Sequence, residues 1–131
     1  VPDKFEGRDA SSLLDDPATP VRDELFMEYY RFGLPHHTRW GFQPIKCVRT
    51  QTHKLVLNLL DRDELYDLQA DPGEMINRIY DPALADLRNQ LHDKILAWMD
   101  RRNDPLRGNG WWQRAWRHEH IMPPRHDGLD S

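Results

Sequence analysis

The sequence predicts an α+β fold in which a small antiparallel sheet of about four strands packs against one long C-terminal helix, followed by an irregular Trp-rich tail. Side-chain character alternates over residues 45–50 and 53–60, as in half-buried strands. The connectors at 51–52 and 61–63 are too short for a helical crossover, so neighbouring strands should pair antiparallel in a meander. Apolar residues that recur every three or four positions after Asp81 predict the helix.

The first thirty residues predict a connector and then a strand. Residues 1–20 are interrupted by Gly7 and by prolines at positions 2, 17 and 20, which favours an irregular segment with one helical turn at 11–14. Over residues 21–30, Leu25, Met27 and Tyr29 alternate with a second set of side chains. This run would supply the first strand and complete a four-stranded sheet.

Residues 31–44 predict a loop, because they contain two glycines and two prolines and follow no sustained period. The loop carries His36, His37, Arg39 and Trp40, which offer hydrogen-bond donors, a cation and an aromatic plate for an anionic sugar. Adjacent side chains of an extended backbone point to opposite sides, so at most one histidine should reach a ligand. The alternative is a surface loop that Trp40 and Phe42 anchor to the sheet. For any single residue of the loop this alternative is favoured, because loops usually lie on the protein surface.

Residues 64–68 predict a further strand that ends in the turn Asp71-Pro72-Gly73. The helix should begin with Asp81 as its capping acceptor and Pro82 in its first position. It should end before Pro105, because the residue preceding a proline avoids the helical region. Its apolar face, which should cover the sheet, comprises Leu84, Leu87, Leu91, Ile95 and Trp98. The opposite face carries Asp86, Gln90, Asp93 and Asp100.

The tail, residues 106–131, contains glycines and prolines that argue against continuous regular structure. It also contains Trp111, Trp112 and Trp116, and leaving each of these side chains in water forgoes roughly 2 kcal/mol of burial free energy. We therefore expect the tail to dock on the rest of this chain or on a further domain. The alternative is a sugar-stacking platform next to Arg107, Arg114 and Arg117.

A second pattern runs through the same elements. Its residues are Arg49-Thr50, His53-Lys54-Leu55, Asn58, Glu64-Leu65-Tyr66-Asp67-Leu68, Asp71-Pro72, Glu74 and Asn77, preceded by Phe5-Glu6-Gly7-Arg8 and Leu13-Leu14. This pattern resembles the C-terminal subdomain of type I sulfatases, the sulfate-ester hydrolases of the alkaline phosphatase superfamily. His36-His37 with Pro44, and Trp98 with Asp104-Pro105, are similar to the heparan N-sulfatase (sulfoglucosamine sulfohydrolase) branch.

The resemblance implies a division of the chain and a parent enzyme. Residues 1–20 would connect from a missing N-terminal sulfatase domain, residues 21–105 would form the C-terminal subdomain, and residues 106–131 would be its tail. The parent would use a divalent cation (calcium) and a formylglycine made from a Cys/Ser-x-Pro-x-Arg motif, and would act on a sulfated saccharide or an aryl sulfate. Cys47 precedes Val48-Arg49 and so lacks this motif. We therefore expect no catalytic residue and no metal ligand in this chain, and expect the loop at 36–40 to wall the substrate pocket.

Composition restricts the classes of partner. Hydrophobic residues make up 38% of the chain, below the ~45–50% apolar usage of ordinary domains, and the mean hydropathy is −0.86. We therefore expect some of the apolar surface to serve a partner domain. A net charge of −4 predicts no nucleic-acid binding. No apolar run approaches the ~20 residues of a membrane span, and the chain starts with no signal peptide. We expect a soluble protein, cytoplasmic or periplasmic in a bacterium, and leave homo-oligomerisation open.

Two classes of function remain after these arguments. The first is a sulfatase subdomain, within a sulfuric ester or sulfamate hydrolase, that completes the fold and walls the pocket while catalysis occurs outside this chain. The second is an independent carbohydrate-binding or protein-interaction module without catalysis. An encoding frame with a Cys/Ser-x-Pro-x-Arg motif far upstream would support the first class, and an in-frame start at Val1 the second.

Overall fold

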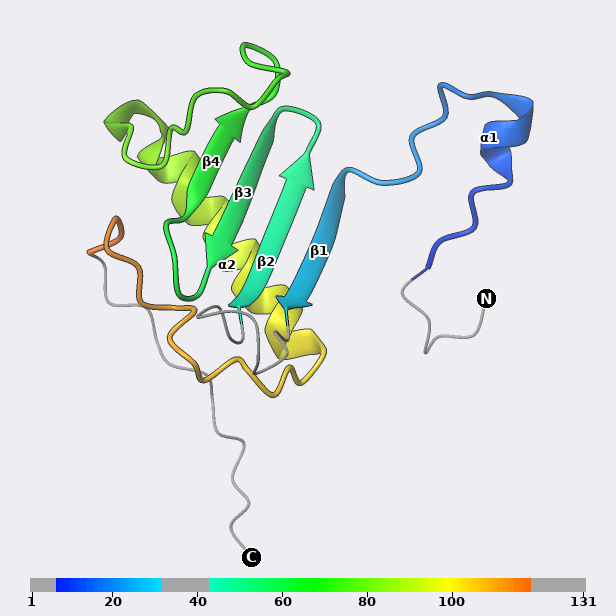
Figure 1. Cartoon of the computed structure of the whole chain (residues 1–131). Coiled ribbons are helices and arrows are strands. Elements are labelled where there is room, and N and C mark those ends of the chain that lie inside the picture. Colours follow the sequence, from blue (N-terminus) through cyan, green and yellow to red (C-terminus); the bar gives the residue numbers. More distant parts are fainter. Residues whose placement is uncertain (1–6, 32–42, 119–131) are drawn as a thin grey trace, which may run out of the picture.

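A computed structural model describes residues 7–31 and 43–118 and confirms the predicted α+β fold. Four strands form one antiparallel sheet in sequential order, and a long helix covers one of its faces (Figure 1). The strands are β1 (Glu24–Arg31), β2 (Gln43–Thr50), β3 (His53–Asn58) and β4 (Glu64–Asp67). The helices are α1 (Ser12–Asp15), the 3-10 turn η1 (Pro82–Leu84) and α2 (Ala85–Arg101).

Short polar connections hold the register of the meander. Between β2 and β3, the Thr50 hydroxyl accepts hydrogen bonds from the amides of Thr52 and His53. After β3, the backbone amide of Asn58 donates to the carboxylate of Asp63 at 2.8 Å, which closes the turn toward β4. These side chains take up backbone donors that the ladder leaves unpaired, so each turn fixes which residues face each other.

The helix begins and ends as the sequence predicts. The Asp81 carboxylate accepts a hydrogen bond from the amide of Ala83, and Pro82 occupies the first position of η1, which leads directly into α2. At the other end, Asn103 adopts a positive φ of 50° and the amide of Asp104 donates to the carbonyl of Met99. This is a Schellman cap with asparagine in the left-handed position, and it ends the helix before Pro105.

The buried face of α2 is wider than the sequence predicts. Leu91, Ile95 and Trp98 pack on the sheet as expected, and Trp98 stacks on Phe26 of β1 with ring centroids 5.1 Å apart. Further residues of α2 are buried as well: Arg88, His92, Leu96 and Met99. The reason is a second covering layer that the period of the helix cannot show, because it comes from the tail.

The tail folds back over α2 and the end of the sheet. Trp111 is fully buried and Trp116 is 6% exposed, and both belong to the same core as the sheet and the helix. Trp112 is partly buried and packs against that core. The tail therefore docks on this subdomain as far as the described residues extend, and burial leaves no ring face of Trp111 or Trp116 open for sugar stacking.

One charged side chain lies within the covered face of the sheet. Lys46 is fully buried, and its ammonium contacts the carboxylates of Glu28 at 2.6 Å and Asp104 at 2.5 Å as well as the hydroxyl of Tyr30. Burial by itself favours the neutral amine, but the hydrogen bonds that the ammonium donates to Asp104, Glu28 and Tyr30 outweigh it and raise the pKa of Lys46. The lysine therefore remains charged and joins β1, β2 and the segment after α2.

The face of the sheet opposite α2 carries exposed apolar side chains on its edge strand β1. On β1, Leu25, Met27 and Tyr29 are 43%, 38% and 58% exposed. Ile45 and Val56, on the neighbouring strands, are partly buried and lie on the same face. We call this set of five residues the open face.

We expect Leu91→Ala to lower the free energy of unfolding by about 2–5 kcal/mol, because it empties a site between helix and sheet. Gln90→Ala is the matched control, since its side chain is exposed on the other side of the same helix. Urea denaturation of both variants measures the difference. Asp93, the other polar neighbour, makes a poorer control because its carboxylate pairs with Arg117 at 2.7 Å. Equal urea midpoints for Leu91→Ala and Gln90→Ala would contradict the packing described above.

Candidate functional site

The predicted substrate-binding residues His36, His37, Arg39 and Trp40 lie outside the described residues. The structure does describe the two strands that flank them. β1 ends at Arg31 and β2 begins at Gln43, and these two residues face each other in the ladder. β1 therefore ends, and β2 begins, at the same end of the sheet.

A small pocket of about 210 Å³ lies next to this hairpin end. Gln43, Pro44 and Ile45 of β2 form one wall, and the end of β3 with residues 59–61 forms the other. The polar groups that line it are amides and one carboxylate, from Gln43, Asn58 and Asp61. Such groups can orient a polar ligand by hydrogen bonds, but they form no nucleophile–base pair.

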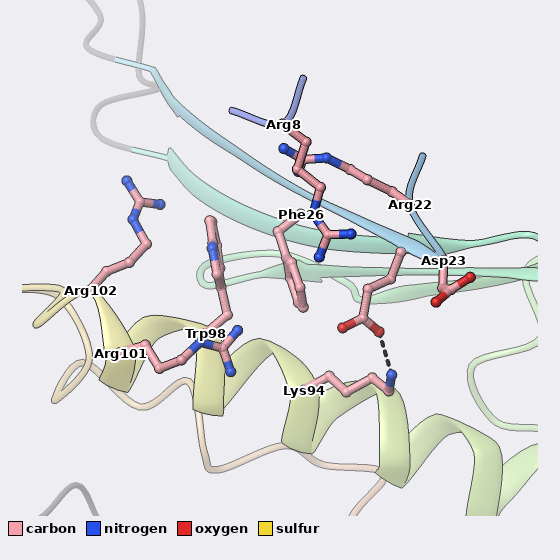
Figure 2. Close-up of a pocket in the computed structure, with 9 residues that line it drawn as sticks. Arg8, Arg22, Asp23, Phe26, Lys94, Trp98, Arg101 and Arg102 are labelled. Carbon is pink, nitrogen blue, oxygen red and sulfur yellow. Dashed lines mark hydrogen bonds and ion pairs between the residues drawn. The ribbon is translucent and has the colours of Figure 1, made fainter. Parts of the chain in front are cut away.

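A larger groove of about 460 Å³ runs between the edge strand β1, the segment before it and α2 (Figure 2). Five cationic side chains line it, and they come from three separate parts of the chain: Arg8, Arg22, Lys94, Arg101 and Arg102. Asp23 and Glu24 are its acidic members, and Phe26 with Trp98 is its aromatic part. Sequence reasoning missed this groove, because its residues are spread over more than ninety positions and form no local motif.

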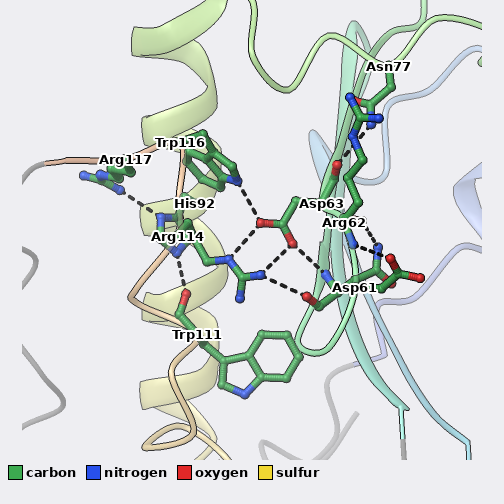
Figure 3. Close-up of polar contacts among 10 residues, drawn as sticks. Asp61, Arg62, Asp63, Asn77, His92, Trp111, Arg114, Trp116 and Arg117 are labelled. Atoms are coloured by element: carbon green, nitrogen blue, oxygen red, sulfur yellow. Dashed lines mark hydrogen bonds and ion pairs between the residues drawn. The ribbon is translucent and has the colours of Figure 1, made fainter. Parts of the chain in front are cut away.

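A buried polar network joins the tail to the turn between β3 and β4 (Figure 3). The Asp63 carboxylate, whose side chain is 4% exposed, pairs with the Arg114 guanidinium at 2.8 Å and accepts the indole N–H of Trp116 at 2.7 Å. Arg114 also donates to the carbonyl of Asn58 at 2.9 Å. The tail is thereby attached to the turn that leads from β3 to β4.

Several residues of the sulfatase-like sequence pattern make contacts that hold the fold together. Asn77 donates to the carbonyl of Asp63 at 3.0 Å and accepts from the amide of Leu65 at 3.1 Å, which ties the segment before η1 to β4. Lys54 pairs with Glu74 at 2.7 Å. These contacts hold β3, β4 and the segment that follows them together.

His92 lies in the same network and is held neutral. Its Nε2 donates to the carbonyl of Trp111 at 2.7 Å, and its Nδ1 is 3.1 Å from the Arg117 guanidinium. Burial, together with the positive charges of Arg117 and Arg114, lowers the pKa of His92 to about 4, although the bond to Trp111 and the charge of Asp93 act in the opposite direction. A proton on Nδ1 would point at a cation.

We expect this histidine to make stability fall at acid pH. Its pKa is near 6.5 in the unfolded chain and about 4 in the fold, so only the unfolded state binds the proton in between. The free energy of unfolding should fall by about 3 kcal/mol as the pH drops from 7 to 4. His92→Gln should flatten that part of the profile, measured by urea denaturation at each pH. Parallel profiles for the two proteins would contradict the assignment.

The described residues contain no ready catalytic centre. Burial raises the pKa of the Cys47 thiol to about 11, so this side chain is protonated near neutral pH and is a poor nucleophile. Within residues 7–31 and 43–118, no group of three or more His, Cys, Asp or Glu side chains is placed to hold a metal ion. No helix in the same residues has the length and apolar character needed to cross a membrane.

The family model for the C-terminal part of N-sulphoglucosamine sulphohydrolase matches residues 1–101. The uncharacterized sulfatase YidJ of Escherichia coli (strain K12) is 44% identical over 93 residues, which is 71% of this chain and 19% of YidJ. The structure of BT4656 in complex with its substrate D-glucosamine-2-N,6-O-disulfate superimposes with a TM-score of 0.63 and 27% identity, covering 80% of this chain and 22% of that one.

A crystal structure of a putative sulfatase from Bacteroides thetaiotaomicron VPI-5482 superimposes with a TM-score of 0.68 over 82% of this chain and 22% of that one. Its identity is 22%, so this likeness shows the fold alone. The chain spans about a fifth of the length of each of these three relatives. The chain therefore belongs to the N-sulphoglucosamine sulphohydrolase C-terminal family and has the fold of a sulfatase C-terminal subdomain.

Proposed function

We propose that this chain completes the fold of a sulfatase and walls one side of its substrate pocket, with the catalytic residues in an N-terminal part of the same polypeptide. Residues 1–20 serve as the connector, 21–105 as the subdomain and 106–131 as its tail. These relatives are about five times as long as the matched region, which leaves room for a separate catalytic domain. The parent enzyme uses a formylglycine and a divalent cation, calcium, held in that domain.

The open face is the observation that carries the proposal. A sheet covered by a helix on one side normally has polar residues on its other side, whereas this one presents Leu25, Met27 and Tyr29. Contiguous exposed apolar patches on soluble proteins usually mark interaction surfaces. β1 directly follows the segment that connects from upstream, so the N-terminal domain of the same polypeptide is the nearest occupant for this face.

A substitution on the open face tests the proposal in the full-length enzyme. Met27→Asp should abolish most sulfatase activity and raise protease sensitivity, while the isolated chain with the same change keeps its melting temperature. Met75→Asp is the matched control, because Met75 is 83% exposed and lies outside the sheet, so it is not one of the five residues of the open face. Wild-type activity in Met27→Asp would contradict docking through this face.

The isolated chain and the full-length protein should differ in activity. The isolated chain should not hydrolyse an aryl sulfate with or without calcium, because its nucleophile lies elsewhere. The full-length protein should hydrolyse it. Turnover by the purified isolated chain would contradict the first of these expectations, and a full-length protein that lacks turnover but binds sugars would favour an independent binding module.

We further propose that the substrate is a sulfated saccharide and that His36, His37, Arg39 and Trp40 contact it at the pocket rim. Loss of one charge-assisted contact costs about 1.5–3 kcal/mol, so Arg39→Ala, or Ala at the contacting histidine, should lower kcat/KM for the saccharide roughly ten- to a hundredfold. A small aryl sulfate, which does not reach the rim, should be hydrolysed almost normally. If Trp40 only anchors the loop, Trp40→Ala will lower the melting temperature and affect both substrates alike.

A further inference from the structure

The two edges of the sheet differ in how their backbone groups are paired. At β4, the amide of Leu65 donates to the side chain of Asn77 at 3.1 Å, and its carbonyl accepts from the amide of Arg78 at 2.7 Å. β1 forms the opposite edge and pairs with β2 over eight residues without a bulge. Proteins usually protect so long and regular an edge, because its unpaired groups can accept another strand.

Alternation along the strands shows which backbone groups of β1 point outward. The carbonyl of Pro44 accepts from the amide of Leu59 at 3.2 Å, so every second residue of β2, counted from Pro44, directs its backbone groups at β3. The intervening residues of β2 bond to the three open-face residues of β1. Glu24, Phe26 and Glu28 therefore direct their N–H and C=O groups away from the sheet. No described residue forms a hydrogen bond with these groups.

The surfaces on the two sides of this edge differ in character. The side chains of Glu24 and Phe26 line the groove between β1 and α2, whose five cations and two carboxylates give a net charge of +3, whereas the whole chain carries −4 at pH 7. In Figure 2 the arginines of the upstream segment and the basic side chains of α2 approach this groove from opposite sides. The open face lies on the other side of the edge. A strand added there would meet cations with one set of side chains and apolar groups with the other.

The described carboxylates neutralise only part of the positive charge of the groove. Lys94 pairs with Glu24. Arg8 donates to the carbonyl of Val21 at 3.2 Å, and neither Arg8 nor the exposed Arg101 pairs with a carboxylate among the described residues. A concave surface with uncompensated charge of this sign attracts anionic groups.

We propose that the edge of β1 receives one further antiparallel strand, whose acidic residues face the groove and whose apolar residues face the open face, from the upstream part of the same polypeptide. The inference rests on the proposed function and specifies how the N-terminal domain attaches. Antiparallel pairing continues the pattern of the whole sheet. In such strand addition the main chain supplies affinity and alternate side chains supply specificity.

The upstream part is the occupant for two reasons. The chain spans about a fifth of the length of its relatives, and Arg8 and Arg22, from the segment that leads into β1, themselves line the groove. A second copy is a poorer occupant. Antiparallel pairing of two identical edges would keep both helix-covered faces on one side and set two cationic grooves next to each other.

Antiparallel pairing also fixes which amides of the added strand bond to β1. Residues that lie opposite each other have their side chains on the same face and direct their backbone groups at each other or away together. The outward residues Glu24 and Phe26 have their side chains on the groove side. The acidic residues of the added strand therefore bond to β1, and its apolar residues direct their amides away.

Isothermal titration of the 131-residue chain with a peptide of alternating glutamate and valine, as long as β1, tests this arrangement. N-methylation of the glutamate amides should weaken binding at least about tenfold, whereas N-methylation of the valine amides should change it less than about twofold. Lysine in place of glutamate should also weaken binding at least about tenfold, as should Arg101→Glu. Arg62→Glu is the matched control, because it makes the same charge change at an exposed position between β3 and β4.

Amide hydrogen exchange resolved to single residues tests the source of the strand. In the isolated chain, the outward amides of Glu24, Phe26 and Glu28 should exchange much faster than those of Leu25 and Met27, which bond to β2 and serve as the internal control. In the full-length enzyme all five amides should be protected, and the peptide should no longer bind.

The proposal is overturned if the isolated chain does not bind the peptide, or if the two N-methylated peptides bind equally well. It is also overturned if the outward amides exchange equally fast in the isolated chain and in the full-length enzyme. Protection of these amides in the isolated chain would assign the edge to this chain itself, or to a second copy if dilution removes the protection.

Hydrolysis of an aryl sulfate by the full-length enzyme distinguishes the two levels of inference. If the enzyme hydrolyses the ester while its outward β1 amides stay unprotected, only the added strand is wrong. If it hydrolyses no sulfate ester, the proposed function fails, whatever the edge of β1 binds.

Discussion

Asp63→Ala is expected to lower the free energy of unfolding by about 3–5 kcal/mol, because it leaves a buried cation without its partner. The side chains of Asp63 and Arg114 are 4% and 10% exposed, so water replaces little of the lost interaction. The same substitution removes the acceptor of the Trp116 indole N–H and of the Asn58 amide. One carboxylate thus holds the β3–β4 turn and the tail together.

Urea denaturation monitored by tryptophan fluorescence measures this loss. Asp61→Ala is the matched control: Asp61 is exposed two positions away and, among the described residues, accepts only from the amide of Arg62. It should change the free energy by less than about 0.5 kcal/mol. A double variant with Arg114→Ala should be less destabilised than the sum of the two single variants, because the second change removes the unpaired charge. Strict additivity would contradict the coupling.

Trp111→Ala should cost about 3–5 kcal/mol, because it removes the largest fully buried side chain of the core. The neighbouring Trp112→Ala is the control. Trp112 is only partly buried, so the loss there should be distinctly smaller. Calorimetric melting temperatures of the two variants make the comparison. Similar losses would show that the tail packs loosely instead of having one tryptophan locked in the core.

Periodicity predicts the sheet and the helix because each of these elements repeats its pattern several times. Leu55 and Leu57 of β3 alternate with partly exposed neighbours, and Leu91, Ile95 and Trp98 recur on one side of α2. The caps are local too, since Asp81 and Pro82 act within one turn. Local patterns are therefore enough to predict these elements, and the structure confirms them.

The rest depends on contacts between distant residues. Alternation over residues 45–50 does not show which set of side chains is buried, and Lys46 can be buried because Asp104, 58 residues later, accepts a hydrogen bond from its ammonium. Its tryptophans predict that the tail docks, but the tail shows no period, so nothing local indicates that Trp111 and Trp116 enter the core between sheet and helix. The groove between β1 and α2 likewise exists only when Arg8 and Arg101 meet in space. The loop at 36–40 remains a prediction.

The order of synthesis gives the Asp63 network a meaning beyond stability. A chain emerges from its amino end, so Asp63 is exposed to solvent well before Arg114 and Trp116, which follow it by 51 and 53 residues. Until those residues arrive, the sheet and helix lack their last covering layer. A message truncated shortly after α2 would therefore yield a recognisable but unclosed subdomain, exposed to proteases. The subdomain therefore closes only after the chain has been synthesised as far as Trp116.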